Sequence, residues 1–519
     1  MKRYACIFVG CNRCSLKVAQ RGAGGKVNIL DQAEFPVNFG SRIFADEAVS
    51  AQSVSELCRI IEEYLSIAAQ SAPEKVDIFI SAALRRAINS IYIYERIRDA
   101  VKPYTVHLMS DEDELVGFIE GMMLTVPEIV DTQEFKSDSL MVSLKGDSFL
   151  LAYLKDGTVC YITRIPLGYR KLTAMTENIT ERSESFGRLL TEIVTNYIRP
   201  VRMHLRKGKI RHIYFSSTDF DGIAKLKNPE FKRRGADEHL WLSKDEVNGM
   251  YQGMKDLMPN QLQRKYPFLE ESESATVLYT LVFCRALLES ISTDSLCMIP
   301  SDIGNALAMY QFKQTKFDRL TDWIAESGYA SAKEAAARYG VDLRHAEETE
   351  YYALRFFDTL KKRYTLVKRE RYMLRICAML AEAGQFIGEE DRAAASEFLI
   401  NRMEILGLTA RERFLCARIC AHTADPAYIG IPTDRDLAEN EQLTCAQLTA
   451  VLKLAEAVDA GRKQKINKLT CSLTEDSFTV RASTSKNTHL EMYDFNSART
   501  CFRQVYGLNP VLTIKRVKI

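Results

Sequence analysis

The chain has 519 residues, more than one hydrophobic core usually supports, so we expect two to four domains. Apolar residues make up 46% of the sequence and charged residues 27%, which is typical of a soluble globular protein, and without a low-complexity tract we expect no disorder outside loops. The formal net charge of +2 creates no global field that would favour nucleic acid or a membrane. No uninterrupted apolar run is long enough to cross a bilayer, and we expect a cytoplasmic protein.

The thirteen cysteines are odd in number and irregularly spaced, which predicts reduced thiols. Cys11 and Cys14 form a C-x-x-C pair. A metal or redox site of this kind needs a second C-x-x-C or nearby histidines, which the sequence lacks, so the role of the pair stays open.

The first part of the chain alternates strand and helix patterns, which is typical of an α/β domain. Two short strands flank the small-residue turn 10–13, a hairpin that can wrap a phosphate. An acidic turn at 110–113 precedes a further helical pattern. The other predicted elements are a helix at 54–69, a strand at 76–80, a helix at 91–100 and a strand at 105–109.

A second copy of this plan begins near residue 138, with strands at 140–144 and 150–154 around the turn 145–148. The simplest inference is two similar halves that face a cleft. The pattern continues with a helix at 181–197, a strand at 211–215 and helices at 242–257 and 275–290.

From about residue 317 to 460 the pattern is almost wholly helical, which predicts a separate domain. The tail returns to strands at 468–471, 477–483 and 511–514, with a helix at 496–506. Basic residues cluster at 199–211 and 361–371. These clusters are either solvated helix faces or contacts for an anionic ligand.

Four segments in order resemble the exopolyphosphatase / guanosine pentaphosphate phosphatase (Ppx/GppA) family. They are I-S-A-A-L-R-R-A-I-N at 80–89, S-D-E-D-E-L at 110–115, P-L-G at 166–168 and L-A-E-A-V-D-A-G-R-K-Q-K-I at 454–466. The resemblance implies two actin-like (ribonuclease H-like, ASKHA) domains at 1–130 and 131–315. A helical HD-like region with a small C-terminal α/β segment would follow at 316–519.

The resemblance also implies a function: hydrolysis of polyphosphate or of guanosine penta- or tetraphosphate, with Mg²⁺ as the expected cofactor. Such chemistry clamps charged oxygens and orients a water molecule. Glu114 matches the carboxylate that activates water and Arg85 the arginine that contacts phosphate. The remaining phosphate-binding candidates lie in the two turns: Gly10, Asn12 and Arg13, and Lys145, Gly146 and Ser148.

Much of the family's site is nevertheless replaced. Phe8 and Ser143 stand where the two hairpins carry aspartates, and Leu150 stands for a glutamate. Lys145 and Asp147 replace glycines that let phosphate approach the backbone. We therefore expect hydrolysis to be weakened or lost; the alternative is a non-catalytic sensor or scaffold that binds an anionic ligand or a protein partner.

In the helical region, His345, His422 and Asp459 match metal-ligand positions of the HD pattern. The diagnostic His-Asp pair is replaced by Ala381 and Glu382. Because a metal site needs several such ligands, we expect no metal there. By resemblance we also expect a homodimer, with no membrane or specific nucleic-acid partner.

Overall fold

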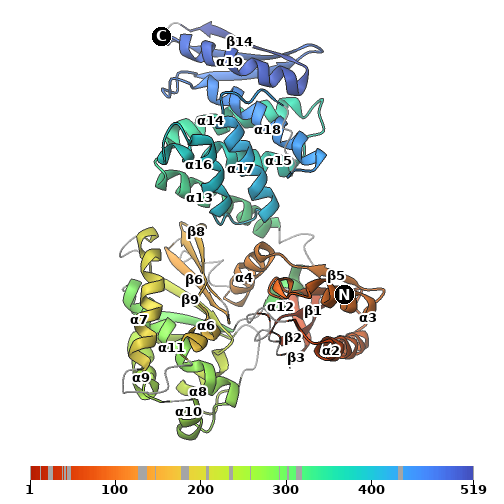
Figure 1. Ribbon diagram of the computed structural model, residues 1–519, viewed down its shortest axis with the longest axis vertical. Helices are drawn as coiled ribbons and strands as arrows, with labels where there is room; N and C mark the ends of the chain where they lie inside the picture. The colour runs from red at the N-terminus through yellow and green to blue at the C-terminus, as the bar shows by residue number, and fades with distance from the viewer. Residues whose placement is uncertain are drawn as a thin grey trace. The chain divides into compact units, whose positions relative to one another are not determined.

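The protein is described by a computed structural model that divides into two compact units, Met1–Ile324 and Ala325–Ile519 (Figure 1). The described residues are 2–11, 13–21, 27–37, 39, 43, 48–126, 137–146, 148–176, 186–205, 210–232, 238–257, 259–291, 293–300, 303–310, 318–430 and 436–517.

The first sheet of unit 1 has five strands in the order β3-β2-β1-β4-β5. Its first three strands form an antiparallel meander, and β4 and β5 then add in parallel to β1. Residues that face the core from β1 and β2 are fully buried, as alternation in a half-buried strand predicts. The bounds are β1 (Arg3–Val9), β2 (Arg13–Arg21), β3 (Val27–Pro36), β4 (Lys75–Ile80) and β5 (Thr105–Leu108).

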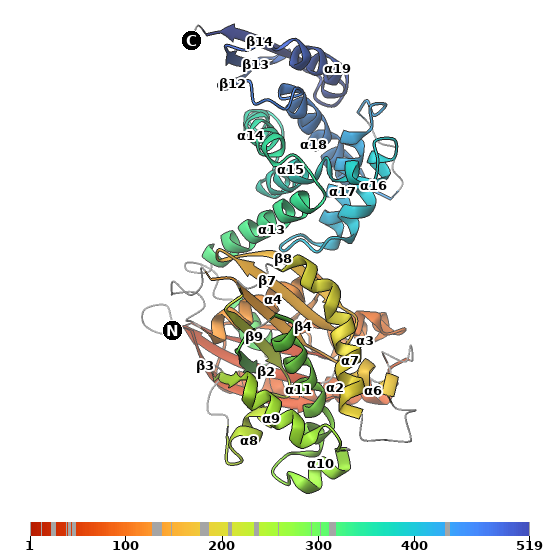
Figure 2. The same cartoon turned by 90° about the vertical axis from the view of Figure 1, so that its left-hand side faces the viewer.

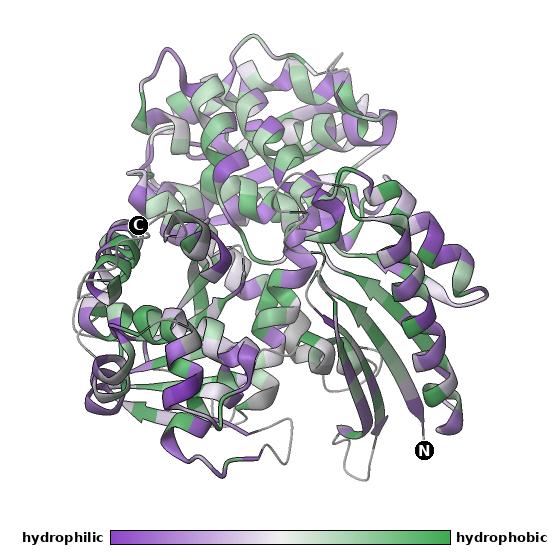
Figure 3. Cartoon of the chain, turned by 60° about the horizontal axis from the view of Figure 1, so that its bottom comes forward, coloured by the Kyte–Doolittle hydropathy of each residue, from purple (hydrophilic) through white to green (hydrophobic). Residues whose placement is uncertain are grey.

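The second sheet repeats this plan, which confirms the predicted duplication. Its order is β10-β11-β9-β6-β7-β8: β6, β7 and β8 form the meander, β9 and β11 add in parallel, and β10 is an antiparallel edge. In Figure 3 the strands of unit 1 are drawn mainly in the hydrophobic colour, as expected for sheets covered by helices. The bounds are β6 (Ser139–Leu144), β7 (Phe149–Lys155), β8 (Thr158–Ile165), β9 (His212–Ser217), β10 (Leu240–Ser243) and β11 (Ser295–Pro300).

The described helices of unit 1 pack around these sheets (Figures 1 and 2). One of them, α11, is long and apolar enough to span a membrane by length and composition alone, but 67% of that stretch is buried inside the unit, as in a core helix. The α-helices are α2 (Ala51–Gln70), α3 (Ser90–Ala100), α4 (Asp111–Thr125), α6 (Tyr169–Thr176), α7 (Phe186–Ile198), α8 (Phe220–Lys227), α9 (Lys244–Met254), α10 (Pro259–Lys265), α11 (Glu271–Ile291) and α12 (Ile303–Tyr310).

Element boundaries differ from the sequence prediction at particular places. The helix predicted from residue 242 begins at Lys244, because Ser243 caps it and forms a capping box with Glu246. The residues before it form the edge strand β10. Strands β3 and β8 were not predicted, although each completes the meander of its sheet.

Unit 2 combines a helical part with a three-stranded sheet of order β12-β13-β14. The helices share one continuous core with the inner face of the sheet and with α19. Helix α13 (Asp318–Arg338) contains the division between the units. The other elements are α14 (Leu343–Leu360), α15 (Lys368–Leu380), α16 (Arg392–Arg402), α17 (Ala410–Ala424), α18 (Glu439–Val458), β12 (Lys468–Leu473), β13 (Ser477–Thr484), α19 (His489–Tyr506) and β14 (Asn509–Arg516).

The turn between β6 and β7 is fixed by close packing against the start of α6. A Cβ atom on Gly168 would lie 2.3 Å from the carbonyl oxygen of Lys145 and 2.5 Å from the carbonyl carbon of Gly146. The same two carbonyls accept hydrogen bonds from the backbone of Tyr169 and Arg170. Only glycine allows this approach, which explains the glycine of the P-L-G motif.

We expect Gly168→Ala to lower the free energy of unfolding by about 1–3 kcal/mol, because two backbone segments would have to move apart. The matched control is Gly249→Ala in α9, where a Cβ meets nothing within 4 Å. That change should be neutral or stabilise the protein by up to about 1 kcal/mol. Chemical denaturation of both variants tests this, and equal midpoints would contradict the packing argument.

Candidate functional site

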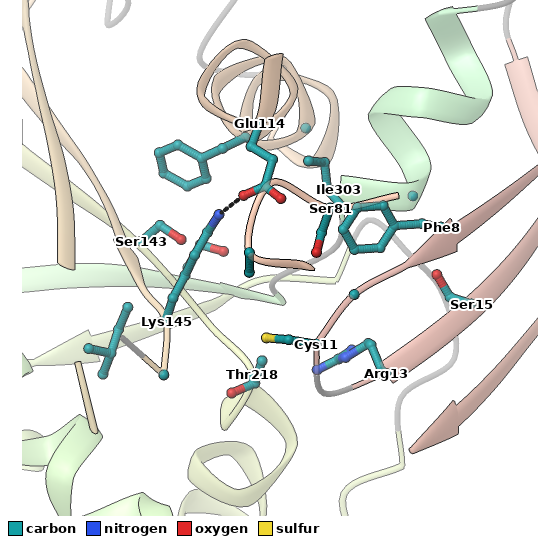
Figure 4. Close-up of a pocket in the computed structure, with 18 of the residues that line it drawn as sticks. Phe8, Cys11, Arg13, Ser15, Ser81, Glu114, Ser143, Lys145, Thr218 and Ile303 are labelled. Carbon is teal, nitrogen blue, oxygen red and sulfur yellow. Dashed lines mark hydrogen bonds and ion pairs between the residues drawn. The ribbon is translucent and has the colours of Figure 1, made fainter. Parts of the chain in front are cut away.

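A cavity of about 150 Å³ lies in unit 1 at the carboxyl ends of the parallel strands of both sheets. This edge is where ligands usually bind in open α/β sheets. Ends of β1, β4, β6, β9 and β11 contribute Gly10, Ser81, Lys145, Thr218 and Pro300. Residues of α4 between Asp111 and Met122 and the first turn of α12 also line the wall. Figure 4 shows Ser81, Lys145 and Thr218 around the cavity, together with Glu114 and Ile303 from the two helices.

Glu114, the predicted catalytic residue, lies in this wall with both carboxylate oxygens occupied. Its Oε1 accepts a hydrogen bond of 2.8 Å from the backbone N–H of Ala82, and its Oε2 accepts one of 2.9 Å from Lys145 Nζ. Its residue surface is only 6% exposed. The lysine thus neutralises the carboxylate that a water molecule would have to approach (Figure 4).

A second ion pair joins the same two halves of unit 1. Asp111, one turn before Glu114 on α4, contacts Arg164 Nη1 of β8 at 3.4 Å and Arg86 Nη2 at 2.9 Å. Positions i and i+3 share a helix face, so both acids point toward the second sheet's residues. The first turn of α4 therefore receives one cation from β8 and one from the β6–β7 turn.

The rest of the cavity wall combines apolar groups with hydroxyls. Phe8 places its ring where the family resemblance implies a metal-binding aspartate (Figure 4). The hydroxyls of Ser81 and Ser143 are buried, and within the described part of the chain they have no hydrogen-bond partner. Unpaired buried hydroxyls are costly, so these two are candidates to bind a ligand's polar atoms.

The structure brings together five of the predicted site residues in this wall: Gly10, Arg13, Glu114, Lys145 and Gly146. Two others lie outside the lining. Arg85 is exposed and donates to the carbonyl of Met109 at 3.4 Å, and Ser148 is buried with its carbonyl bonded to the N–H of Lys145. Asn12 and Asp147 fall outside the described residues.

Sequence reasoning missed two cations of the site. Arg86, and not its neighbour Arg85, reaches the cavity, and Arg164 comes from the unpredicted strand β8. The signal for Arg86 was present as a second arginine in the same motif. Asn89, matched to the family's motif, uses its amide to bind the backbone of Val49 and is structural here.

The donor set of the cavity does not fit Mg²⁺. Magnesium prefers several oxygen ligands, usually including carboxylates. The described lining contains only two carboxylates, Asp111 and Glu114, and both are paired with cations. Four cations line the same cavity: Arg13, Arg86, Lys145 and Arg164. This excess of positive charge favours the binding of an anion over that of a metal ion.

The candidate metal residues of unit 2 form an ion-pair network. His345 Nδ1 lies 3.0 Å from Asp459 Oδ2, and Arg462 binds both oxygens of Glu382. His422 lies elsewhere, stacked on the ring of Tyr428 at 4.2 Å. Within the described ranges no group of three or more His, Cys, Asp or Glu side chains could hold a metal ion.

Two groups of this network titrate abnormally. Burial raises the pKa of Glu456 to about 7, and its Oε1 has no hydrogen-bond partner among the described residues. Burial alone would lower the pKa of His345, but its hydrogen bond to Asp459 and the charge of Glu382 raise that pKa above its ordinary value. Arg392 and Lys453 also face Glu456 and oppose its shift.

The bridge between Lys145 and Glu114 predicts a measurable coupling energy. In a double-mutant cycle with Lys145→Ala and Glu114→Gln, we expect a coupling free energy of about 1–3 kcal/mol, because the pair is largely buried. The exposed pair of Arg59 and Glu63 on α2 is the control and should give about 0.3–0.5 kcal/mol. A coupling at Lys145 no larger than the control would refute a structural bridge.

The raised pKa values predict a pH-dependent stability. Between pH 4.5 and about pH 7, the carboxyl of Glu456 binds its proton more tightly in the folded chain than in the unfolded chain. The free energy of unfolding therefore falls as the pH rises through this range. His345 acts in the same direction near and above 6.5. Glu456→Gln should therefore reduce the fall in the free energy of unfolding across this pH range by roughly 1–3 kcal/mol.

Urea denaturation of the full chain across this range measures the effect. Glu439→Gln, at an exposed position in the first turn of the same helix α18, should keep the wild-type pH profile. If both variants follow the wild-type profile, Glu456 does not cause the decline.

The chain is similar to known proteins both in sequence and in fold. A sequence model described as Ppx/GppA phosphatase, domain III, matches residues 329–497. The guanosine-5'-triphosphate,3'-diphosphate pyrophosphatase of Photobacterium profundum is 21% identical over 429 residues, which cover 80% of this chain and 79% of that protein.

Solved structures share the fold. A Ppx/GppA family member from Aquifex aeolicus is 17% identical with a TM-score of 0.52, and the match covers 60% of this chain and 99% of that one. An exopolyphosphatase from Cytophaga hutchinsonii is 14% identical with a TM-score of 0.51, over 60% of this chain and 97% of that one. The chain is therefore similar to the Ppx/GppA family in sequence over its helical region and in fold over the part that these solved structures cover.

Proposed function

We propose that the chain binds a phosphate-rich anion, polyphosphate or a guanosine polyphosphate, in the cavity of unit 1 and hydrolyses it weakly or not at all. The observation that carries this proposal is the ion pair between Glu114 and Lys145. A carboxylate that already accepts from a backbone N–H and an ammonium group is a poor base toward water. Loss of even one positioned electrostatic group commonly costs about two to three orders of magnitude in rate.

Binding, in contrast, remains chemically supported. The lining holds four cations against two carboxylates, and two unpaired hydroxyls face the same space. Arg13 has its side chain partly exposed beside the β1–β2 turn and pairs only with Glu34 among the described residues, at 3.2 Å. A cationic side chain here supplies the positive charge that a metal ion supplies in a metal-dependent phosphatase.

A scaffold that takes no ligand in this cavity is the alternative function. The two proposed functions both assume weak or absent hydrolysis, and they differ in whether the cavity binds an anion. We also propose that the helical part of unit 2 is an HD-like domain whose metal ligands have been replaced by the network of Glu382 and Arg462. A homodimer and a cytoplasmic location remain proposals that follow from the family and from the thirteen free cysteines.

The decisive experiment measures phosphate release from long-chain polyphosphate and from guanosine pentaphosphate with Mg²⁺. We expect the wild-type chain and Glu114→Ala to show the same negligible release. Each ligand should raise the melting temperature of the wild type, because a ligand that binds only the folded state stabilises it. Arg13→Gln should weaken this stabilisation, and Arg59→Gln on α2 should not.

Wild-type turnover that disappears in Glu114→Ala would overturn the proposal and make Glu114 an active base. Absence of both turnover and stabilisation would instead favour the scaffold.

A further inference from the structure

The outer face of the C-terminal sheet carries cations and hydroxyls but no carboxylates. The inner face of β12, β13 and β14 packs into the core of unit 2, so alternate residues point outward. In register, the outward rows are Lys468, Ser483 and Lys515; then Thr470, Arg481 and Thr513; then Ser472, Thr479 and Val511. Glu475 and Asp476 lie in the turn between β12 and β13, at the far end of the face from Lys468, and Asp358 lies in the hollow beside Thr470.

The three cations of this face are available to a partner. Lys468 and Lys515 have no ion pair within the part of the chain that the structure describes, and Arg481 Nη1 bonds only the hydroxyl of Ser472, at 3.0 Å. Strands lie about 4.8 Å apart, so Lys468 and Lys515, on either side of β13, are roughly 10 Å apart. Arg481 lies one row further along, between them. This arrangement suits the repeated charges of an extended polyanion better than one compact ion.

A hollow of about 620 Å³ adjoins the edge of this face. Thr470 belongs both to the outward rows and to the wall of the hollow, whose other wall is α14. Helix α14 lies along the edge strand β12, where Arg355 donates to the carbonyl of Leu469. Figures 1 and 2 show α14 and the C-terminal sheet in the same unit.

The hollow contains an exposed aromatic ring among cations. Tyr351 is 44% exposed, and the guanidinium of Arg355 lies 4.6 Å from its ring centre. Lys362 has no ion pair in the described ranges, whereas Arg371 is bound by Asp358 through two hydrogen bonds. An exposed ring beside basic side chains is the combination on which unpaired bases stack.

We propose that this surface, the outward rows of β12–β14 together with the Tyr351 hollow, binds single-stranded RNA. The cations contact phosphates, the ring of Tyr351 stacks on a base, and the threonine and serine hydroxyls bond the ribose 2′-hydroxyls. A duplex would present no free base to Tyr351, and an acidic peptide would make no use of the ring and the hydroxyl rows. The net charge of +2 over the whole chain does not oppose this, because the positive charge is concentrated on one face.

The test is fluorescence anisotropy of a labelled, unstructured single-stranded RNA with the full chain over a series of salt concentrations. Arg481→Gln with Lys515→Gln should weaken binding and lower the steepness of log K against log salt by about 1.4, at roughly 0.7 for each phosphate contact. The control variant removes two positive charges away from this surface, with Arg503→Gln on α19 and Lys2→Gln just before β1. Its slope of log K against log salt should equal that of the wild type.

The stacking step has its own test. Tyr351→Ala should lower affinity roughly tenfold, and Tyr351→Phe should retain it. Melting temperatures of all variants should match the wild type, because every altered side chain is at least partly exposed.

Three results would overturn the proposal: no RNA binding at low salt, equal losses in the sheet-face and control variants, or equal affinity for DNA of the same sequence. Binding of inorganic polyphosphate or polyglutamate without binding of RNA would also overturn it. The cavity of unit 1 is not involved, so failure here leaves the proposed function untouched.

Discussion

The structure of unit 1 depends on the first turn of α4. Two acids one turn apart, Asp111 and Glu114, receive Arg164 and Lys145 from the second sheet's side of the cavity. The capping box at Ser110 begins the helix at this point and sets the spacing of the acids. Since Glu114 is almost wholly buried, removing its lysine would leave a poorly solvated charge, so the pair constrains the two halves as well as the chemistry.

The same kind of replacement occurs in both units. In unit 1 an ammonium group holds the carboxylate that resembles the family's base, and in unit 2 the guanidinium of Arg462 binds Glu382 where the HD pattern has a metal ligand. A side-chain cation satisfies the buried carboxylate, but it cannot polarise water as a metal ion does. A buried carboxylate can therefore be satisfied by a side-chain cation without a change of fold, because packing and catalysis depend on different residues.

Much of the architecture could be predicted from sequence patterns. The duplication was visible because both hairpins follow the same sequence of short strand, small-residue turn and returning strand, and the helical region was visible from its period. Strand β8 was missed, and with it Arg164. Arg85 and Arg86 show the limit of motif matching: adjacent residues in a short helical turn point in different directions, so only one of them reaches the cavity.

By itself the sequence determined the resemblance to the Ppx/GppA family, the repeated α/β plan, the replacement of the hairpin acids and the presence of Glu114. These follow from residue identity and local periodicity, which need no knowledge of distant contacts. Only the tertiary structure decided that Lys145 pairs with Glu114, that Arg164 joins Asp111, and that the outward cations of the C-terminal sheet share one face. Those results depend on which residues meet across long separations in sequence, and such meetings are fixed by the packing of whole sheets and helices.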